Sequence, residues 1–185
     1  PGTSAITDSE HFMLAGRTSH GGSVTVAGKP ITVDPEGRFA QLMSVDSEGE
    51  TKIIVRASLA DHAPRLVQLK VRRTSDLKKV AEEFRKTAVT DYASVAQNAQ
   101  ASLGLAVSLK GRVEEAKLSG HSTIVLLDVS SGCLHAPCLA RVVLGARRKL
   151  KPGTIVTACG HLRGAVDGPV SGVRIPEIHA ELLLE

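Results

Sequence analysis

The period of the hydrophobic residues changes twice along the chain, and this change limits what the chain can fold into. Apolar and polar residues alternate in short runs over residues 10–73 and again over residues 104–185, which is typical of half-buried strands. Over residues 74–103 apolar residues recur at steps of three and four, as on one face of an amphipathic helix. The sequence therefore predicts a mainly β chain, with two domains joined by a helix after a disordered polar start at residues 1–9.

Turn signals divide the first β segment into several short strands. Val24 and Val26 alternate with polar neighbours, as do Ile31 and Val33, and the turns fall at GKP, DPEG and SEG. Several short strands at this spacing predict a β-sandwich over residues 10–73.

The amino-acid sequence of this segment resembles that of a known family. The stretch SVTVAGKPITVDPEGRF, followed by GETKIIVRAS, resembles bacterial immunoglobulin-like modules of the glucodextranase B type. Thr51 stands where that family usually has Asn. The resemblance implies an Ig-like sandwich, and such modules usually serve as spacers or adhesive units of extracytoplasmic proteins. The residues that fall on the family pattern are Val24, Val26, Gly28, Ile31, Val33, Asp34, Gly37, Phe39, Gly49, Ile53, Val55 and Ala57.

The helical segment has start and stop signals. Ser75 can cap its beginning with Asp76 in the first turn, and Gly104 can close its end. It forms either one continuous helix or two, the second starting at Thr90-Asp91. We expect a connector rather than an oligomerising helix, because the apolar face is mostly alanine and too short for a sustained heptad seam.

The second β segment contains five apolar runs, which suit the five strands of a Greek-key OB barrel. The spacing leaves room for a short helix between the third and fourth strands, and Gly111 would let the first strand bend. The segment resembles OB domains of the tRNA-anticodon-binding-like class in three stretches of sequence, LKGRVEEA, KPGTIVTACGHLRG and IPEIHAELL. The five runs are LAVSLKGRVEEAKL, HSTIVLLDV, CLARVVLG, TIVTACGHLRGAV and IPEIHAELLL.

Two cysteines bracket a short loop. Cys133 and Cys138 are separated by four residues that include Pro137, so the chain can turn back and bring their Cα atoms within disulfide distance. Closing so small a loop adds only about 2 kcal/mol of stability. We expect this disulfide, and it would indicate an oxidising compartment.

A metal site and three unpaired thiols are the alternatives to the disulfide. His135 lies between the first two cysteines, and Cys159 and His161 follow later, so five side chains could bind a metal ion that needs four. The spacing matches no zinc-finger form, and Cys159 and His161 lie on the same face of one strand. We therefore expect no metal ion, and we expect Cys159 to be a free core thiol.

A group of basic residues near the fourth OB strand is a candidate phosphate-binding or partner-binding patch. The net charge of +4 is mild, and residues 104–185 contain no Phe, Tyr or Trp on which bases could stack. A solvated turn or a face for an acidic partner protein is therefore favoured over a nucleic-acid site. The candidate residues are Arg141, Arg147, Arg148, Lys149, Lys151 and Arg163.

The sequence contains no recognised catalytic motif. There is no nucleophile elbow, phosphate loop or metalloprotease helix, and no cofactor is indicated. Three polar pairs are more simply explained as ordinary surface groups: Ser19-His20, Asp61-His62 and Glu114-Glu115. We expect a protein that is not an enzyme.

The function is expected to reside in surfaces. The main hypothesis is a binding or scaffolding module of a bacterial envelope or surface protein, periplasmic or extracellular, that engages a protein partner. A polysaccharide is a weaker candidate because stacking aromatics are missing. The alternative is a cytoplasmic OB protein that binds nucleic acid through the patch at Arg147–Lys151. No apolar run is long enough to span a bilayer and no signal peptide is visible, so we expect a piece of a longer protein whose full length includes an anchor or signal.

Overall fold

The computed structural model describes residues 3–97, 99–133 and 137–185. They form two compact units, with the division between residues 75 and 76. The helical segment thus belongs to the same unit as the second β segment. Within the described residues, no helix is long and apolar enough to cross a membrane.

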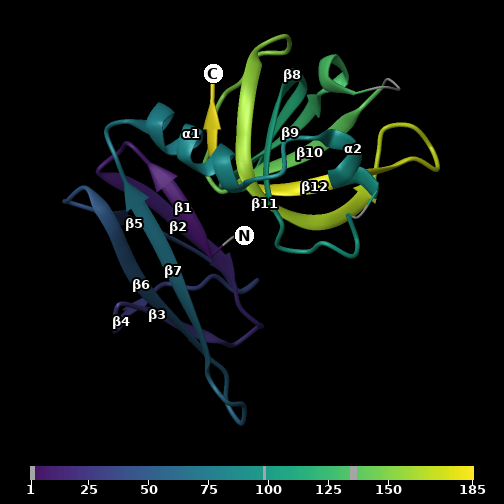
Figure 1. The fold of residues 1–185 in the computed structure, drawn as a ribbon. Coiled ribbons are helices and arrows are strands. Elements are labelled where there is room, and N and C mark those ends of the chain that lie inside the picture. The colour runs from purple at the N-terminus through teal and green to yellow at the C-terminus, as the bar shows by residue number, and fades with distance from the viewer. Residues whose placement is uncertain (1–2, 98, 134–136) are drawn as a thin grey trace. The chain divides into compact units, whose positions relative to one another are not determined.

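The N-terminal unit is a sandwich of two sheets (Figure 1). The order of β7, β6, β3 and β4 in one sheet, with β2 and β5 in the other, is that of the G-F-C-C′ and B-E strands of an immunoglobulin-like fold. The predicted sandwich of two sheets is therefore confirmed, and its assignment to the Ig-like modules stays a prediction. The larger sheet runs β1 (Ser4–Thr7), β7 (Arg65–Arg73), β6 (Gly49–Ser58), β3 (Ser23–Val26) and β4 (Lys29–Ile31); the smaller pairs β2 (His11–Arg17) with β5 (Arg38–Ser44).

The core of the sandwich follows from the alternation seen in the sequence. The larger sheet turns Val24, Val26, Ile53 and Val71 inward, and each is at most 5% exposed. Aromatic and aliphatic side chains of the smaller sheet pack against them, among them Phe12, Leu14, Phe39 and Met43. Because every second residue of these strands faces inward, the outward positions remain in solvent.

The expectation of a disordered start is wrong for residues 4–7. These residues form β1, which runs parallel to β7 in register with Lys70 to Arg73. The backbone amide of Lys70 also donates a hydrogen bond to the carbonyl of Thr3 (2.8 Å). Parallel pairing with the edge of β7 satisfies polar backbone groups that a polar sequence alone does not show to be paired.

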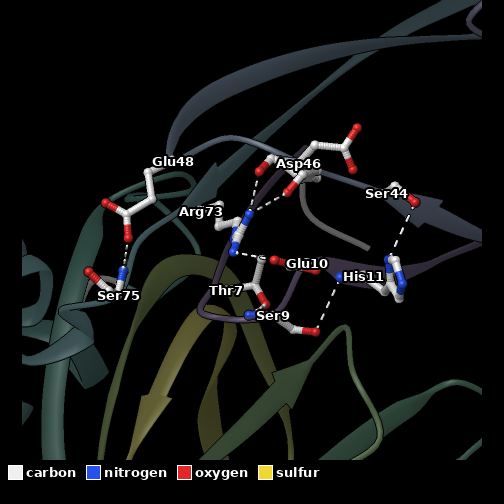
Figure 2. A network of polar contacts seen from close by, with 10 residues as sticks. Thr7, Ser9, Glu10, His11, Ser44, Asp46, Glu48, Arg73 and Ser75 are labelled. Carbon is white, nitrogen blue, oxygen red and sulfur yellow. Dashed lines mark hydrogen bonds and ion pairs between the residues drawn. The ribbon is translucent and has the colours of Figure 1, made fainter.

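The side chain of Arg73 ties three segments of the sandwich together at one end (Figure 2). Its Nη1 donates to the backbone carbonyls of Val45 (3.2 Å) and Asp46 (2.6 Å), and its Nη2 donates to Glu10 (2.9 Å). Only 17% of the Arg73 side chain is exposed. Charged hydrogen bonds from a largely buried guanidinium hold the β1–β2 and β5–β6 turns against the end of β7.

The C-terminal unit is a closed five-stranded barrel whose strands lie in the order β10-β12-β11-β8-β9. β10 and β12 are parallel and the other neighbours are antiparallel. This is the arrangement of an OB-type Greek-key barrel, as predicted. The strands are β8 (Ala106–Ser119), β9 (Ser122–Asp128), β10 (Leu139–Leu144), β11 (Ile155–Asp167) and β12 (Arg174–Leu184).

The helical segment forms two helices, α1 (Leu77–Thr87) and α2 (Tyr92–Gln97), so the alternative with a second helix is right. Between them Ala88 is extended, and the amide of Val89 donates to the carbonyl of Ala106, which turns the chain onto β8. Asp91 then caps α2 by accepting from the amide of Ser94 (2.8 Å). Asp76, rather than Ser75, caps α1.

The two helices pack on different parts of the barrel. α1 lies on the outer face against β8, β11 and β12 (Figure 1). From α2 and the turn after it, Val95 and Ala99 reach into the barrel core. The short helix that the spacing allowed between the third and fourth strands is not formed. Residues 145–154 form turns instead, because this basic, proline-containing stretch lacks an apolar face.

Gly111 has a different role from the expected bend. A Cβ atom at this position would lie 2.4 Å from the carbonyl oxygen of Asp128, so the absent side chain lets the end of β9 approach β8. The irregularity of β8 instead falls between Val113 and Glu115.

Candidate functional site

A cavity of about 760 Å³ lies on the outer face of the barrel, over β8 and β11. We call it the β8–β11 groove. Its walls come from four places in the sequence: the end of α1, the outward positions of β8 and β11, and the turn that follows β9. The side chains that define it are Arg85, Thr90, Ser108, Lys110, Arg112, Asp128, Ser131, Ile155 and Thr157.

Strand alternation places the polar side chains in the groove. On β8, Leu109 and Val113 are buried in the barrel core, so Lys110 and Arg112 face outward. The two cations are thus separated by about 7 Å along the strand. The motif LKGR therefore brings two positive charges to one wall of the groove.

Arg112 is held in place by two carboxylates. Its Nε donates to Glu114 (3.0 Å) and its Nη2 donates to Asp128 (3.1 Å). Hydrogen bonds from Ser130, and then the contact with Arg112, keep the pKa of Asp128 below its ordinary value. Asp128 therefore stays ionised near neutral pH and fixes the guanidinium beside the groove.

The other two cations of the groove are differently placed. Neither Arg85 nor Lys110 has a carboxylate within ion-pair distance among the residues that the structure describes. Both side chains are exposed. Together with the hydroxyls of Thr90 and Thr157, they present hydrogen-bond donors and uncompensated positive charge to an anionic group.

Cys159 lies below the groove. It is fully buried, and its Sγ is 3.5 Å from the Oγ of Ser108, its register partner on β8. Burial raises the pKa of the Cys159 thiol, which therefore stays protonated and is a poor nucleophile at neutral pH. The predicted free, buried thiol is therefore confirmed, and it lies outside the inner cluster of the barrel, on the side that α1 covers.

The close cysteine pair lies next to the groove. Cys133 and Cys138 form a disulfide with a Cα–Cα distance of 6.5 Å, directly after the short 3₁₀ helix η1 (Ser130–Gly132). The loop is also tied by the amide of Cys138, which donates to the Oγ of Ser130 (3.0 Å). His135 lies outside the described residues. In the part of the chain that the structure describes, no group of three or more His, Cys, Asp or Glu residues is placed to hold a metal ion.

The six basic residues singled out from the sequence do not act alike. Arg148 donates to the carbonyl of Leu183 and to Glu185 (2.8 Å), and Arg141 pairs with Glu177 (3.3 Å). These two cations are therefore engaged in holding the barrel together. Exposed side chains remain at Arg147, Lys149 and Lys151 in the β10–β11 turn, and at Arg163 on β11.

Sequence reasoning did not find the groove. Its cations are Arg85, Lys110 and Arg112, whereas the sequence-based predictions were the cysteine pair and the basic RRKLK turn. The one available signal was the pair of cations two residues apart in LKGR, since positions i and i+2 of a strand share a face. Among the polar pairs considered, Glu114 contributes by holding Arg112. Within the described residues, no hydrogen bond joins Ser19 to His20 or Asp61 to His62.

Comparisons with known proteins identify no family for this chain. No protein-family model matches the sequence, and no curated protein matches it. Among solved structures, an aspartyl tRNA synthetase from Entamoeba histolytica aligns with 53% of this chain at 14% sequence identity and a TM-score of 0.39. The alignment covers 21% of that protein, so this chain matches about a fifth of its length.

Proposed function

We propose that this chain is a non-enzymatic binding and scaffolding module of a bacterial envelope or surface protein, and that the β8–β11 groove binds an acidic segment of a partner protein. The observation that carries the proposal is that Arg85 and Lys110 line the same groove and that neither has a carboxylate partner among the described residues. None of the described residues that line the groove is aromatic, which favours carboxylates over stacked bases or sugar rings.

Two further features support the envelope setting. The Cys133–Cys138 disulfide lies beside the groove, and disulfides persist in oxidising compartments. The Ig-like strand order of the N-terminal unit agrees with the resemblance to modules of extracytoplasmic proteins. A scaffold that displays a binding groove on a rigid barrel fits both features.

The proposal is tested by titrating the protein with a synthetic Glu-Gly repeat peptide. We expect binding that weakens with salt, and a loss of about tenfold in affinity in the Arg85→Gln/Lys110→Gln variant. The matched control, Lys149→Gln/Lys151→Gln, removes the same charge from the exposed β10–β11 turn and should retain binding. Equal affinity of both variants for the peptide would contradict a role for the groove.

A second candidate is an OB-type nucleic-acid-binding protein of the cytoplasm. The observations in its favour are the OB topology and the exposed cations Arg147, Lys149 and Lys151 in one turn. Titration with single-stranded DNA and RNA at about 20 mM and about 200 mM salt separates the two candidates. Micromolar binding that weakens steeply with salt supports this second candidate, and absence of binding at the lower salt concentration removes it.

A further inference from the structure

The larger sheet of the N-terminal unit has an outward face with a strong charge imbalance. Strand alternation turns every second side chain of β6 and β7 away from the sandwich core. We call this surface the β6–β7 face and define it by Lys52, Ile54, Arg56, Leu66, Lys70 and Arg72. Glu50 lies at one end of the face, directly opposite Arg72. It belongs to a different unit from the β8–β11 groove and does not depend on it.

Like charges meet on this face. Lys52 lies directly opposite Lys70 in the antiparallel register of the two strands. Among the described residues, Lys52, Arg56 and Lys70 have no carboxylate within ion-pair distance. Directly opposed like charges destabilise a sheet, so these cations are better suited to an external anion than to the folded sandwich alone.

Two large aliphatic side chains lie among these cations. Ile54 is 45% exposed and Leu66 is 65% exposed. They are diagonal neighbours, because Ile54 is opposite Gln68 and Leu66 is opposite Arg56. An aliphatic centre with a charged rim is the usual composition of a protein–protein interface.

Along β6 the outward positions read Glu50, Lys52, Ile54 and Arg56, so that beyond Glu50 a cation, an aliphatic side chain and a cation follow at steps of about 7 Å. An extended acidic segment has the same repeat, because its alternate side chains also lie about 7 Å apart. We propose that the β6–β7 face binds an extended acidic segment of a partner protein, in which carboxylate and aliphatic side chains alternate on one face. The face carries no aromatic side chain for stacking bases, which favours a protein partner over nucleic acid.

The probe for this proposal is a synthetic peptide of repeated Glu-Thr-Val-Thr, which presents Glu and Val alternately on one face when extended. The comparison peptide, repeated Glu-Thr-Ser-Thr, has the same charge without the aliphatic side chains. We expect the Val peptide to bind the intact chain more tightly at low salt. Backbone amide shifts should change on β6 and β7 in NMR spectra.

Three variants separate the contributions. Lys52→Glu/Lys70→Glu should weaken binding of the Val peptide by about tenfold or more. Ile54→Thr/Leu66→Thr should remove the preference for the Val peptide over the Ser peptide. The control Lys78→Glu/Lys79→Glu changes the net charge equally at two exposed positions of α1 and should bind as the unaltered protein does. Circular dichroism establishes that each variant is folded.

Several outcomes would overturn the proposal. These are absence of peptide binding at low salt, equal binding by the Lys52→Glu/Lys70→Glu variant, or loss of binding only in the Lys78→Glu/Lys79→Glu control. Stronger variant-sensitive binding of phosphatidylglycerol vesicles or of single-stranded RNA than of the peptide would assign the face to a different partner. The Arg85→Gln/Lys110→Gln variant should keep this binding, so failure of the groove proposal can be distinguished from failure of this one.

Discussion

Lys52 and Lys70 lie directly opposite each other on β6 and β7, both facing outward. The sandwich thus contains a repulsive pair that a single substitution can convert into an attractive one. Lys52→Glu is expected to raise the free energy of unfolding of the N-terminal unit by about 0.5 kcal/mol, because opposite charges stabilise a cross-strand pair. Chemical denaturation measures the change.

The Lys52→Glu/Lys70→Glu variant completes the thermodynamic cycle. It restores a like-charged pair, so most of the gain from the single substitution should be lost. If Lys52→Glu leaves the midpoint of unfolding unchanged or lowers it, the two side chains do not repel each other in solution. A more stable variant that binds the acidic peptide less well would indicate that the repulsion is retained for binding.

Gly111 is expected to be intolerant of any side chain. A Cβ atom there would lie 2.4 Å from the carbonyl oxygen of Asp128 and 2.8 Å from the Cγ1 of Val129. Gly111→Ala should therefore lower the free energy of unfolding of the barrel by about 1–3 kcal/mol, the usual cost of forcing atoms into a packed site.

Gly145→Ala is the matched control for this substitution, since a Cβ atom at Gly145 meets nothing within 4 Å. Both variants are compared by thermal and chemical denaturation. Equal stability of Gly111→Ala and Gly145→Ala would mean that β8 and the end of β9 lie further apart than the structure places them.

The parts of the fold that could be predicted are those that one strand or helix encodes alone. Alternation along 105–118 or 175–184 predicts a half-buried strand whatever it pairs with, and all five barrel strands were found this way. β1 was missed because four residues are too few to show a period. Its pairing with Lys70 to Arg73 is a long-range contact that no local pattern reports.

The candidate site was hidden for a related reason. The β8–β11 groove joins Arg85 on α1 with Lys110 on β8 and Thr157 on β11, which are far apart in the sequence. The burial of Cys159 also depends on a contact between distant segments. Alternation along β11 shows which face of the strand Cys159 lies on, but that face is buried only because α1 packs against it. The cysteine pair was accessible to prediction because five residues of separation make it a local feature.

The carboxylate of Asp128 should make the barrel more stable at neutral pH than in acid. Hydrogen bonds from Ser130 and the Arg112 guanidinium hold its pKa below the ordinary value of 3.8 in the folded state. A lowered pKa stabilises the folded state above the pKa of the unfolded chain, and this contribution disappears as the pH falls through the folded-state pKa. The melting temperature of the unaltered protein should therefore fall more between about pH 5 and about pH 2 than that of Asp128→Asn.

Asp167→Asn serves as the control for this pH dependence, because it removes a carboxylate from the exposed end of β11. Its melting temperature should follow that of the unaltered protein across the same pH range. Parallel curves for Asp128→Asn and the unaltered protein would show that Asp128 gains no partner on folding.

The Cys133–Cys138 disulfide should stabilise the barrel modestly. Cys133→Ser/Cys138→Ser is expected to lower the free energy of unfolding by about 2 kcal/mol, because the closed loop is short. A reducing agent should lower the melting temperature of the unaltered protein and leave that of the variant unchanged. In unreduced, denatured protein one thiol should react, that of Cys159, and three should react after reduction. Three reactive thiols in unreduced protein taken from an oxidising compartment would contradict the disulfide and remove the strongest support for an envelope location. A single reactive thiol would show that the disulfide forms in that compartment and support the envelope location.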